Sequence, residues 1–189
     1  MTHCSYRERI KTAAEAERYQ RRRPARDRAE LKLVERAFRL IPKNHRVLDI
    51  PCGAGRVTIL LGQLGYSVTA AELSEPMIAA TRENLARAGL SCPVHKEDIE
   101  RMSYVERAFD AIVCFRLFHF PDENVRRRVV KGLCRVAGYC VVVSYFDPRS
   151  LTSLKRALRA KLGGKRSKRS SDTSGKTTLV SSWILRRCP

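Results

Sequence analysis

The chain of 189 residues lacks the features that mark a secreted or membrane-spanning protein. No apolar run reaches the roughly 18 residues that a membrane-spanning helix needs. The first 20 residues are rich in charge and contain no apolar segment of the kind that a secretory signal requires. We therefore expect a protein without a membrane span and with a cytoplasmic location.

Cysteine pairs are also missing from the sequence. The seven cysteines are odd in number, and no two of them form a Cys-x-x-Cys motif. This pattern argues against a disulfide framework and provides no zinc-ligand spacing. We expect no metal site, and we interpret most of the cysteines as small buried thiols.

Acidic residues are scarce relative to basic ones, with 19 Asp and Glu against 38 Lys and Arg, which gives a net charge of +19. The excess lies in the flanks, because residues 1–42 carry a net +6 and residues 121–189 a net +13, whereas residues 43–120 are neutral. A hydrophobic content of 43% is enough for the core of one domain and excludes a fully disordered chain. The basic flanks favour non-specific contact with a polyanion such as RNA.

Apolar residues alternate along the chain between the helical and the strand period. The pattern predicts helices between Pro24 and Pro42 and over 55–64, 74–89, 124–137 and 150–162, and strands over 46–50, 67–72, 92–98, 109–115 and 139–146. Strands that alternate with helices form right-handed parallel units. The expected fold class is α/β, a doubly wound, mostly parallel Rossmann-like sheet with helices on both faces.

The same pattern divides the chain into three parts. Residues 1–27 are expected to form an N-terminal helical extension, and residues 28–162 a single domain. The last part is residues 163–189, of which residues 163–178 are rich in Gly, Ser, Lys and Arg and contain little apolar surface to bury. We expect this last part to be a flexible basic tail.

The most informative segment is the turn at residues 49–55, which follows the first strand and contains Gly53 and Gly55. In an open parallel sheet, ligands bind at the carboxyl ends of the strands, where glycines let the backbone approach the ligand closely. A dinucleotide site needs a third glycine, but Thr58 stands at that position, and Asp49 would repel a pyrophosphate. The acid favours a cationic ligand such as S-adenosylmethionine, which carries a sulfonium and an ammonium group.

The segment VLDIPCGAGRVT, residues 47–58, resembles the first motif of class I S-adenosylmethionine-dependent methyltransferases. The resemblance extends over about residues 28–150 and implies S-adenosylmethionine as the cofactor and a methyltransferase-like domain. It implies the fold of that family with its last strands missing or reduced, because the final residues, TTLVSSWILRRCP, provide at most one short strand. Pro51 departs from the family, which usually has glycine there, and makes the first corner of the loop stiffer.

The resemblance also implies roles for individual residues. Glu72, at the end of the second strand, stands where the family places the acid that accepts the ribose hydroxyls, and Asp98 stands where it holds the adenine amino group. Residues 115–122 resemble the stretch after the fourth strand in the small-molecule branch of the family. The cofactor-binding residues implied in this way are Asp49, Pro51, Cys52, Gly53, Gly55, Glu72, Leu73, Asp98, Ile99 and Phe115.

Two residues near the expected crevice are candidates for contact with a substrate. His119 is the only histidine in that region, and it could act as a base, orient an acceptor, or pack against its aromatic neighbours. Arg116 could hold an anionic substrate group or pair with an acid at the strand end. The sequence leaves these alternatives open.

We expect methyl transfer from S-adenosylmethionine to a small-molecule or lipid-like acceptor. One alternative is an RNA methyltransferase, which the basic runs favour, although no Asp/Asn-Pro-Pro-aromatic segment follows the fourth strand. The other is a shortened cofactor-binding protein that catalyses weakly or depends on a partner. In that case the strand over 139–146 is an apolar sheet edge unless a tail segment or partner covers it. The oligomeric state is not predicted.

Overall fold

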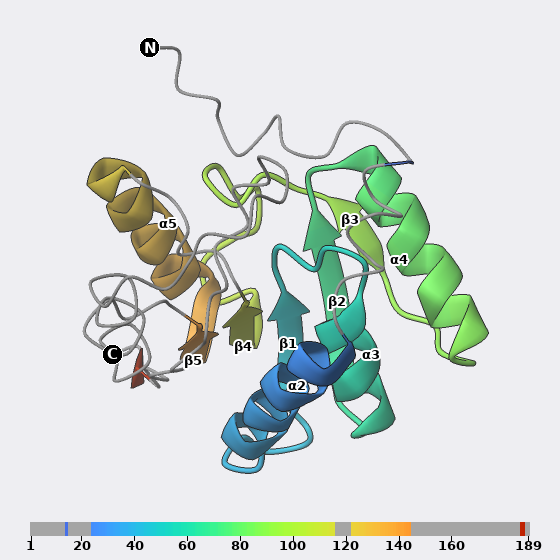
Figure 1. Ribbon diagram of the computed structural model, residues 1–189. Coiled ribbons are helices and arrows are strands. Elements are labelled where there is room, and N and C mark those ends of the chain that lie inside the picture. Colours follow the sequence, from blue (N-terminus) through green and yellow to red (C-terminus); the bar gives the residue numbers. More distant parts are fainter. Residues whose placement is uncertain (1–13, 15–23, 116–121, 145–185, 188–189) are drawn as a thin grey trace, which may run out of the picture.

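The structure is a computed structural model that describes residues 14, 24–115, 122–144 and 186–187 (Figure 1). His119, Arg116 and the helix expected over 150–162 lie outside these residues. The described helices are α2 (Pro24–Phe38), α3 (Arg56–Gln63), α4 (Glu75–Arg87) and α5 (Glu123–Val136). The strands are β1 (Arg46–Asp49), β2 (Ser67–Glu72), β3 (Val94–Lys96), β4 (Phe109–Cys114), β5 (Ala137–Val143) and β6 (Arg186–Arg187).

The strands form one sheet in the order β3-β2-β1-β4-β5-β6. The first five are parallel to their neighbours, and the order reverses direction between β1 and β4. The expected doubly wound, mostly parallel Rossmann-like sheet is therefore confirmed.

The sixth strand is two residues long and lies antiparallel to β5, with Arg186 opposite Val141 and Arg187 opposite Cys140. Both residues belong to the basic tail and pair with the sheet. β5 is consequently covered by a neighbour at Cys140 and Val141, as the one short run expected at the end of the chain allows.

Apolar side chains form a core on each face of the sheet. On one face, strand residues such as Val47 and Val113 pack with α2 and α3 through Phe38 and Leu61. On the other face, a second set that includes Leu48, Ile112 and Leu133 packs beneath α5. Strands buried on both faces explain the continuous apolar runs in the sequence. Figure 1 shows α2 and α3 side by side in front of the sheet and α5 at its left.

Helix α2 is fixed to the sheet at its last turn. Phe38 is fully buried, and its ring meets that of Tyr66 edge to face with centroids 5.2 Å apart. The Tyr66 hydroxyl also donates to backbone carbonyls there, at 2.9 Å from the oxygen of Ile41. These contacts end the helix at Phe38, four residues before the proline expected to stop it.

Two element boundaries differ from the sequence expectation. β5 begins at Ala137, directly after the last residue of α5, whereas a strand was expected from residue 139. Ser74 occupies the N-cap position of α4 as expected, but its side chain makes no capping hydrogen bond to the helix. The neighbouring Glu72 carboxylate instead accepts from the Ser74 backbone amide at 3.1 Å. Among the helices of the described ranges, none is long and apolar enough to cross a membrane.

Candidate functional site

The candidate site lies at the carboxyl edge of the sheet, where β1 and β2 end side by side. Asp49 is the last residue of β1 and Glu72 the last of β2, and both side chains are buried, at 1% and 5% exposure. β1 is also the strand at which the sheet order reverses, which is where open α/β sheets bind ligands. The fold thus brings together the two acids that the sequence singled out.

One oxygen of the Asp49 carboxylate accepts a hydrogen bond and the other does not. The Thr58 hydroxyl donates to Oδ2 at 2.6 Å. Oδ1 is buried and has no hydrogen-bond partner in the described part of the chain. Burial raises the pKa of Asp49 from 3.8 to about 7, although the Thr58 hydrogen bond opposes this rise. An unpaired buried acceptor is costly, so this oxygen points to a ligand that supplies a donor.

Glu72 holds the start of the glycine loop. Its Oε2 accepts from the Gly53 amide at 3.1 Å, and its Oε1 accepts from the Leu73 amide at 2.8 Å and from the Ser74 amide at 3.1 Å. Burial raises the pKa of Glu72, and these backbone hydrogen bonds counteract the rise. The carboxylate therefore braces the loop in addition to any role toward a ligand.

The glycine loop connects β1 to α3 through two residues in the left-handed region. Gly53 has φ 59° and Gly55, the N-cap of α3, has φ 79°. The Gly55 amide donates to the Cys52 carbonyl at 3.0 Å, and the Cys52 amide donates to the Ala71 carbonyl of β2 at 2.9 Å. The bond before Pro51 is cis. Burial raises the pKa of the Cys52 thiol well above its ordinary value, so this cysteine is not an activated nucleophile.

The other candidate residues follow the next strands at the same edge. Asp98 and Ile99 come shortly after β3, with Ile99 buried and Asp98 half-buried. The Asp98 carboxylate accepts from the Glu100 amide at 3.0 Å. Phe115 is buried directly after β4. Because the carboxyl ends of parallel strands share one edge, these residues extend the site from β1 and β2 to β3 on one side and β4 on the other.

Three residues that the sequence did not predict as part of the site contact it. Thr58, expected only as a missing glycine, donates to Asp49. Thr81 and Asn84 of α4 donate to the carbonyls of Gly53 and Ala54. Thr81 and Asn84 lie one helical turn apart in α4. This spacing gave no signal that the two side chains reach a loop about 30 residues earlier in the chain.

Gly55→Ala should weaken ligand binding at the carboxyl edge of the sheet more than a glycine-to-alanine change at Gly65. A Cβ at Gly55 would lie 2.9 Å from Thr81 Cγ2, and the residue needs a positive φ. Gly65 has φ 83° but open space around its Cβ position, so Gly65→Ala is the matched control for backbone strain alone. Strain of this kind costs about 1 to 3 kcal/mol.

Urea unfolding and binding of S-adenosylhomocysteine (SAH) to both variants test this expectation. Both should lose stability, and Gly55→Ala alone should lose more than about tenfold in affinity. Equal affinity of the two variants would show that the close approach of Gly55 to α4 is irrelevant to the site.

Comparison with known proteins finds similarity over most of this sheet. Residues 47–138 match a family model described as a methyltransferase domain. A curated relative, the ubiquinone biosynthesis O-methyltransferase of Xanthomonas axonopodis pv. citri (strain 306), is 28% identical over 102 residues. The match covers 53% of this chain and 43% of that protein, so it spans less than half the length of the relative.

Solved structures share the fold. Protein PH0226 from Pyrococcus horikoshii OT3 superposes with a TM-score of 0.62 and 24% identity, covering 70% of this chain and 63% of that one. Magnesium protoporphyrin IX methyltransferase from Synechocystis PCC 6803, solved with bound SAH, has a TM-score of 0.57 and 18% identity, covering 72% of this chain and 65% of that one. Over residues 47–138 the chain is therefore similar to methyltransferases, and it shares the fold of these solved structures.

Proposed function

We propose that the chain binds S-adenosylmethionine at the carboxyl edge of β1 and β2 and transfers its methyl group to a small-molecule or lipid-like acceptor. The observation that carries this proposal is the unpartnered Oδ1 of Asp49. An ammonium group at this position would supply the missing donor and the opposite charge. The residues present therefore fit the cofactor that the family implies.

Charge at the edge supports a cationic ligand over a phosphate. Asp49 and Glu72 end neighbouring strands, and Asp98 follows the next one. The loop has its glycines where a ligand can approach the backbone, but the adjacent acids disfavour a pyrophosphate. We propose that Glu72 also accepts the ribose hydroxyls, that Asp98 holds the adenine amino group, and that Ile99 and Phe115 pack on the cofactor.

The chemistry requires little from the protein beyond alignment. The cofactor supplies a methyl group already activated on a sulfonium, and transfer is an in-line displacement by the acceptor atom. Holding donor and acceptor in line supplies roughly 7 to 11 kcal/mol of such a barrier. The buried walls of the edge and the glycine loop provide that positioning without a dedicated base. His119 and Arg116 remain proposals for contact with the acceptor.

The relatives support a small acceptor. The Xanthomonas relative is named for ubiquinone biosynthesis and O-methylation, and the Synechocystis structure is named for magnesium protoporphyrin IX. Both names denote acceptors that are small molecules rather than nucleic acids. The chain shares the domain with the first of these and the fold with the second, and the acceptor itself remains part of the proposal.

Methyl transfer tests the proposed function directly. The full chain is incubated with radiolabelled S-adenosylmethionine and either RNA or one of a panel of phenolic, carboxylic and lipid-like acceptors, and label in the isolated product is counted. We expect transfer to at least one small acceptor, abolished in Asp49→Asn. Transfer to RNA alone would favour the RNA methyltransferase alternative. Tight binding of SAH with no transfer to any acceptor would favour the cofactor-binding alternative.

Glu72→Ala should weaken SAH binding by more than about tenfold, since hydrogen bonds to a charged group contribute about 1.5 to 3 kcal/mol. Glu75→Ala is the matched control, because Glu75 is exposed and pairs with Lys96 at 2.8 Å on the surface. We expect the control to bind SAH as the wild type does.

A 2′-deoxy analogue of SAH separates a ribose contact from bracing of the loop. If Glu72 meets the ribose, removing the 2′-hydroxyl should cost affinity in the wild type and little in Glu72→Ala. An equal cost in both proteins would remove the ribose assignment and leave Glu72 as a brace for Gly53.

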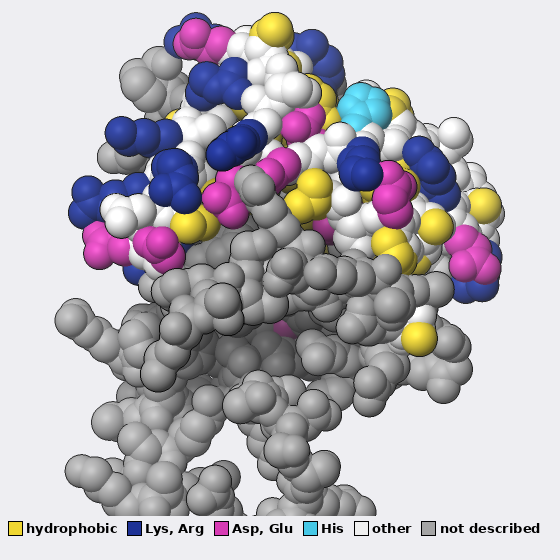
Figure 2. All heavy atoms as spheres, turned by 90° about the horizontal axis from the view of Figure 1, so that it is seen from above, with side chains coloured by type: hydrophobic (Ala, Val, Ile, Leu, Met, Phe, Trp, Pro, Cys, Tyr) yellow, Lys and Arg dark blue, Asp and Glu magenta, His cyan; other side chains and the backbone are white. Residues whose placement is uncertain are grey.

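Polyanion binding should be weak and dependent on salt. Figure 2 shows Lys and Arg side chains gathered at the left, the side on which α5 lies in Figure 1, with acidic side chains among them. Arg127 pairs with Glu123 at 2.8 Å and Arg128 with Glu100 at 3.4 Å, which reduces the charge available to phosphates. Fluorescence anisotropy with a short RNA should therefore show affinity that falls steeply as salt rises. Tight, sequence-selective binding at high salt would favour RNA as the acceptor.

A further inference from the structure

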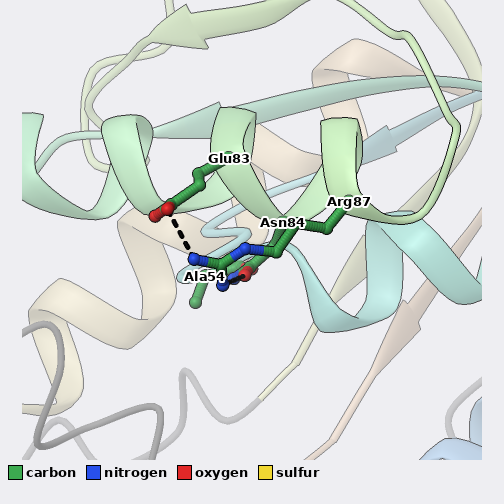
Figure 3. Close-up of polar contacts among 4 residues, drawn as sticks. All are labelled: Ala54, Glu83, Asn84 and Arg87. Atoms are coloured by element: carbon green, nitrogen blue, oxygen red, sulfur yellow. Dashed lines mark hydrogen bonds and ion pairs between the residues drawn. The ribbon is translucent and has the colours of Figure 1, made fainter.

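Helix α4 contacts the glycine loop with two side chains on one face. The Thr81 hydroxyl donates to the Gly53 carbonyl at 2.6 Å. The Asn84 amide donates to the Ala54 carbonyl at 3.0 Å (Figure 3). Residues three apart in a helix lie on the same face, so these two donors meet two successive carbonyls of the loop. Thr81 is fully buried and Asn84 half-buried, so water is largely excluded from these hydrogen bonds.

The orientation of the Asn84 amide is set by its other neighbour. Arg87 donates to Asn84 Oδ1 at 3.4 Å and to Glu83 Oε1 at 2.5 Å (Figure 3). A guanidinium can only donate, so it faces the amide oxygen and leaves the amide nitrogen facing the Ala54 carbonyl. The ion pair between Arg87 and Glu83 is exposed, so it contributes little energy by itself.

Fixing the carbonyls also fixes the amides of the loop. In a trans peptide the C=O and the following N–H point in opposite directions. With its carbonyls held by α4, the loop directs the Ala54 amide away from the helix. Gly53 and Gly55 both have positive φ, a conformation with many alternatives for glycine, and so the loop needs contacts from outside to hold one of them.

We propose that Thr81 and Asn84 are positioning residues that hold the glycine loop in the conformation required for binding the cofactor. This inference rests on the proposed function and adds to it a contact from outside the loop. It also explains why a glycine is needed at position 55. Thr81 lies so close to the loop that a Cβ at Gly55 would clash with the Thr81 methyl. Neither side chain need touch the ligand.

The test compares conservative and disruptive changes at both positions. Thr81→Val removes the hydroxyl and keeps the shape, whereas Thr81→Ser keeps the hydroxyl. Asn84→Asp keeps the shape and places a carboxylate against the Ala54 carbonyl. Arg82→Ala on the same helix is the control, because Arg82 donates to the Val94 carbonyl and not to the loop. Calorimetry with SAH gives affinity, and amide hydrogen exchange of Gly55 in the unliganded chain reports on the loop.

We expect Thr81→Val and Asn84→Asp to lose about tenfold in affinity and to exchange the Gly55 amide faster. Thr81→Ser should regain most of the affinity, and Arg82→Ala should match the wild type. If the wild type binds SAH and both disruptive variants bind it equally well, this proposal is overturned and the proposed function stands. A wild type that binds no SAH overturns the proposed function and this inference with it.

Discussion

Asp49→Asn is expected to lower the affinity for SAH by well over tenfold at pH 8, because it removes the negative charge that we propose faces the ammonium group. A charge-assisted hydrogen bond contributes about 1.5 to 3 kcal/mol, and burial away from water strengthens the charge interaction further. Asp110→Asn is the control, since Asp110 lies at the opposite edge of the sheet, beside Arg46. Calorimetry at pH 8 measures both variants against the wild type.

The same residue should give SAH binding a pH dependence. The pKa of Asp49 is about 7 in the free protein, and the proposed contact with the ammonium group needs the ionised carboxylate. Below pH 7, affinity of the wild type should therefore fall by about tenfold per pH unit, because a proton must leave before the ligand binds. Asp49→Asn should show no such fall. A wild-type affinity that is flat between pH 5.5 and 8 would contradict the assignment of Asp49 to the ammonium group.

Asp49 should also make the unliganded protein less stable as pH rises. Its pKa is raised from 3.8 to about 7 by burial, so the folded carboxyl keeps its proton in a range where the unfolded chain has lost it. Folding then takes up a proton, and the free energy of unfolding falls as pH increases from about 4 to 7. This group alone should cost the wild type about 2 to 3 kcal/mol between pH 5 and pH 8.

Urea unfolding from pH 5 to pH 8 isolates this effect when the wild type is compared with Asp49→Asn. Burial also raises the pKa of Glu72, whereas the arginine partners of Asp110 and Glu123 lower the pKa of these two groups. Both proteins share all three groups, so their effects cancel in the comparison. The stability of the variant relative to the wild type should therefore rise with pH. Parallel curves would mean that Asp49 is not buried in the folded protein.

The sequence predicted the sheet well because its strands are buried on both faces. The run at residues 109–115 is apolar almost throughout and became β4, and the run over 46–50 became β1, each with its end within one residue. The glycine loop was equally predictable from the sequence, because Gly53 and Gly55 both adopt the positive φ that glycine permits. Local pattern was sufficient wherever burial and backbone conformation determined the structure.

The remaining features depend on contacts between distant residues. A short strand was expected near the end of the chain, but β6 consists of two arginines with no apolar alternation, so the sequence did not indicate these residues or their pairing with β5. The contact of Asn84 with Ala54 spans 30 positions and becomes visible only once α4 is packed against the loop. In the sequence Thr58 stood out only as the absence of a glycine. Its hydrogen bond to Asp49 forms only when the first turn of α3 packs over the end of β1, so the sequence alone did not indicate it. In each case tertiary packing, not local propensity, decides the outcome.

Calorimetric titration of the full chain with SAH at pH 8 tests the central claim most directly, namely that the acid-flanked edge of β1 and β2 is a cofactor site. We predict saturable binding of one SAH per chain that Asp49→Asn weakens by well over tenfold and Asp110→Asn leaves unchanged. Binding that is absent at millimolar SAH, or that is the same in the wild type and Asp49→Asn, would contradict the account.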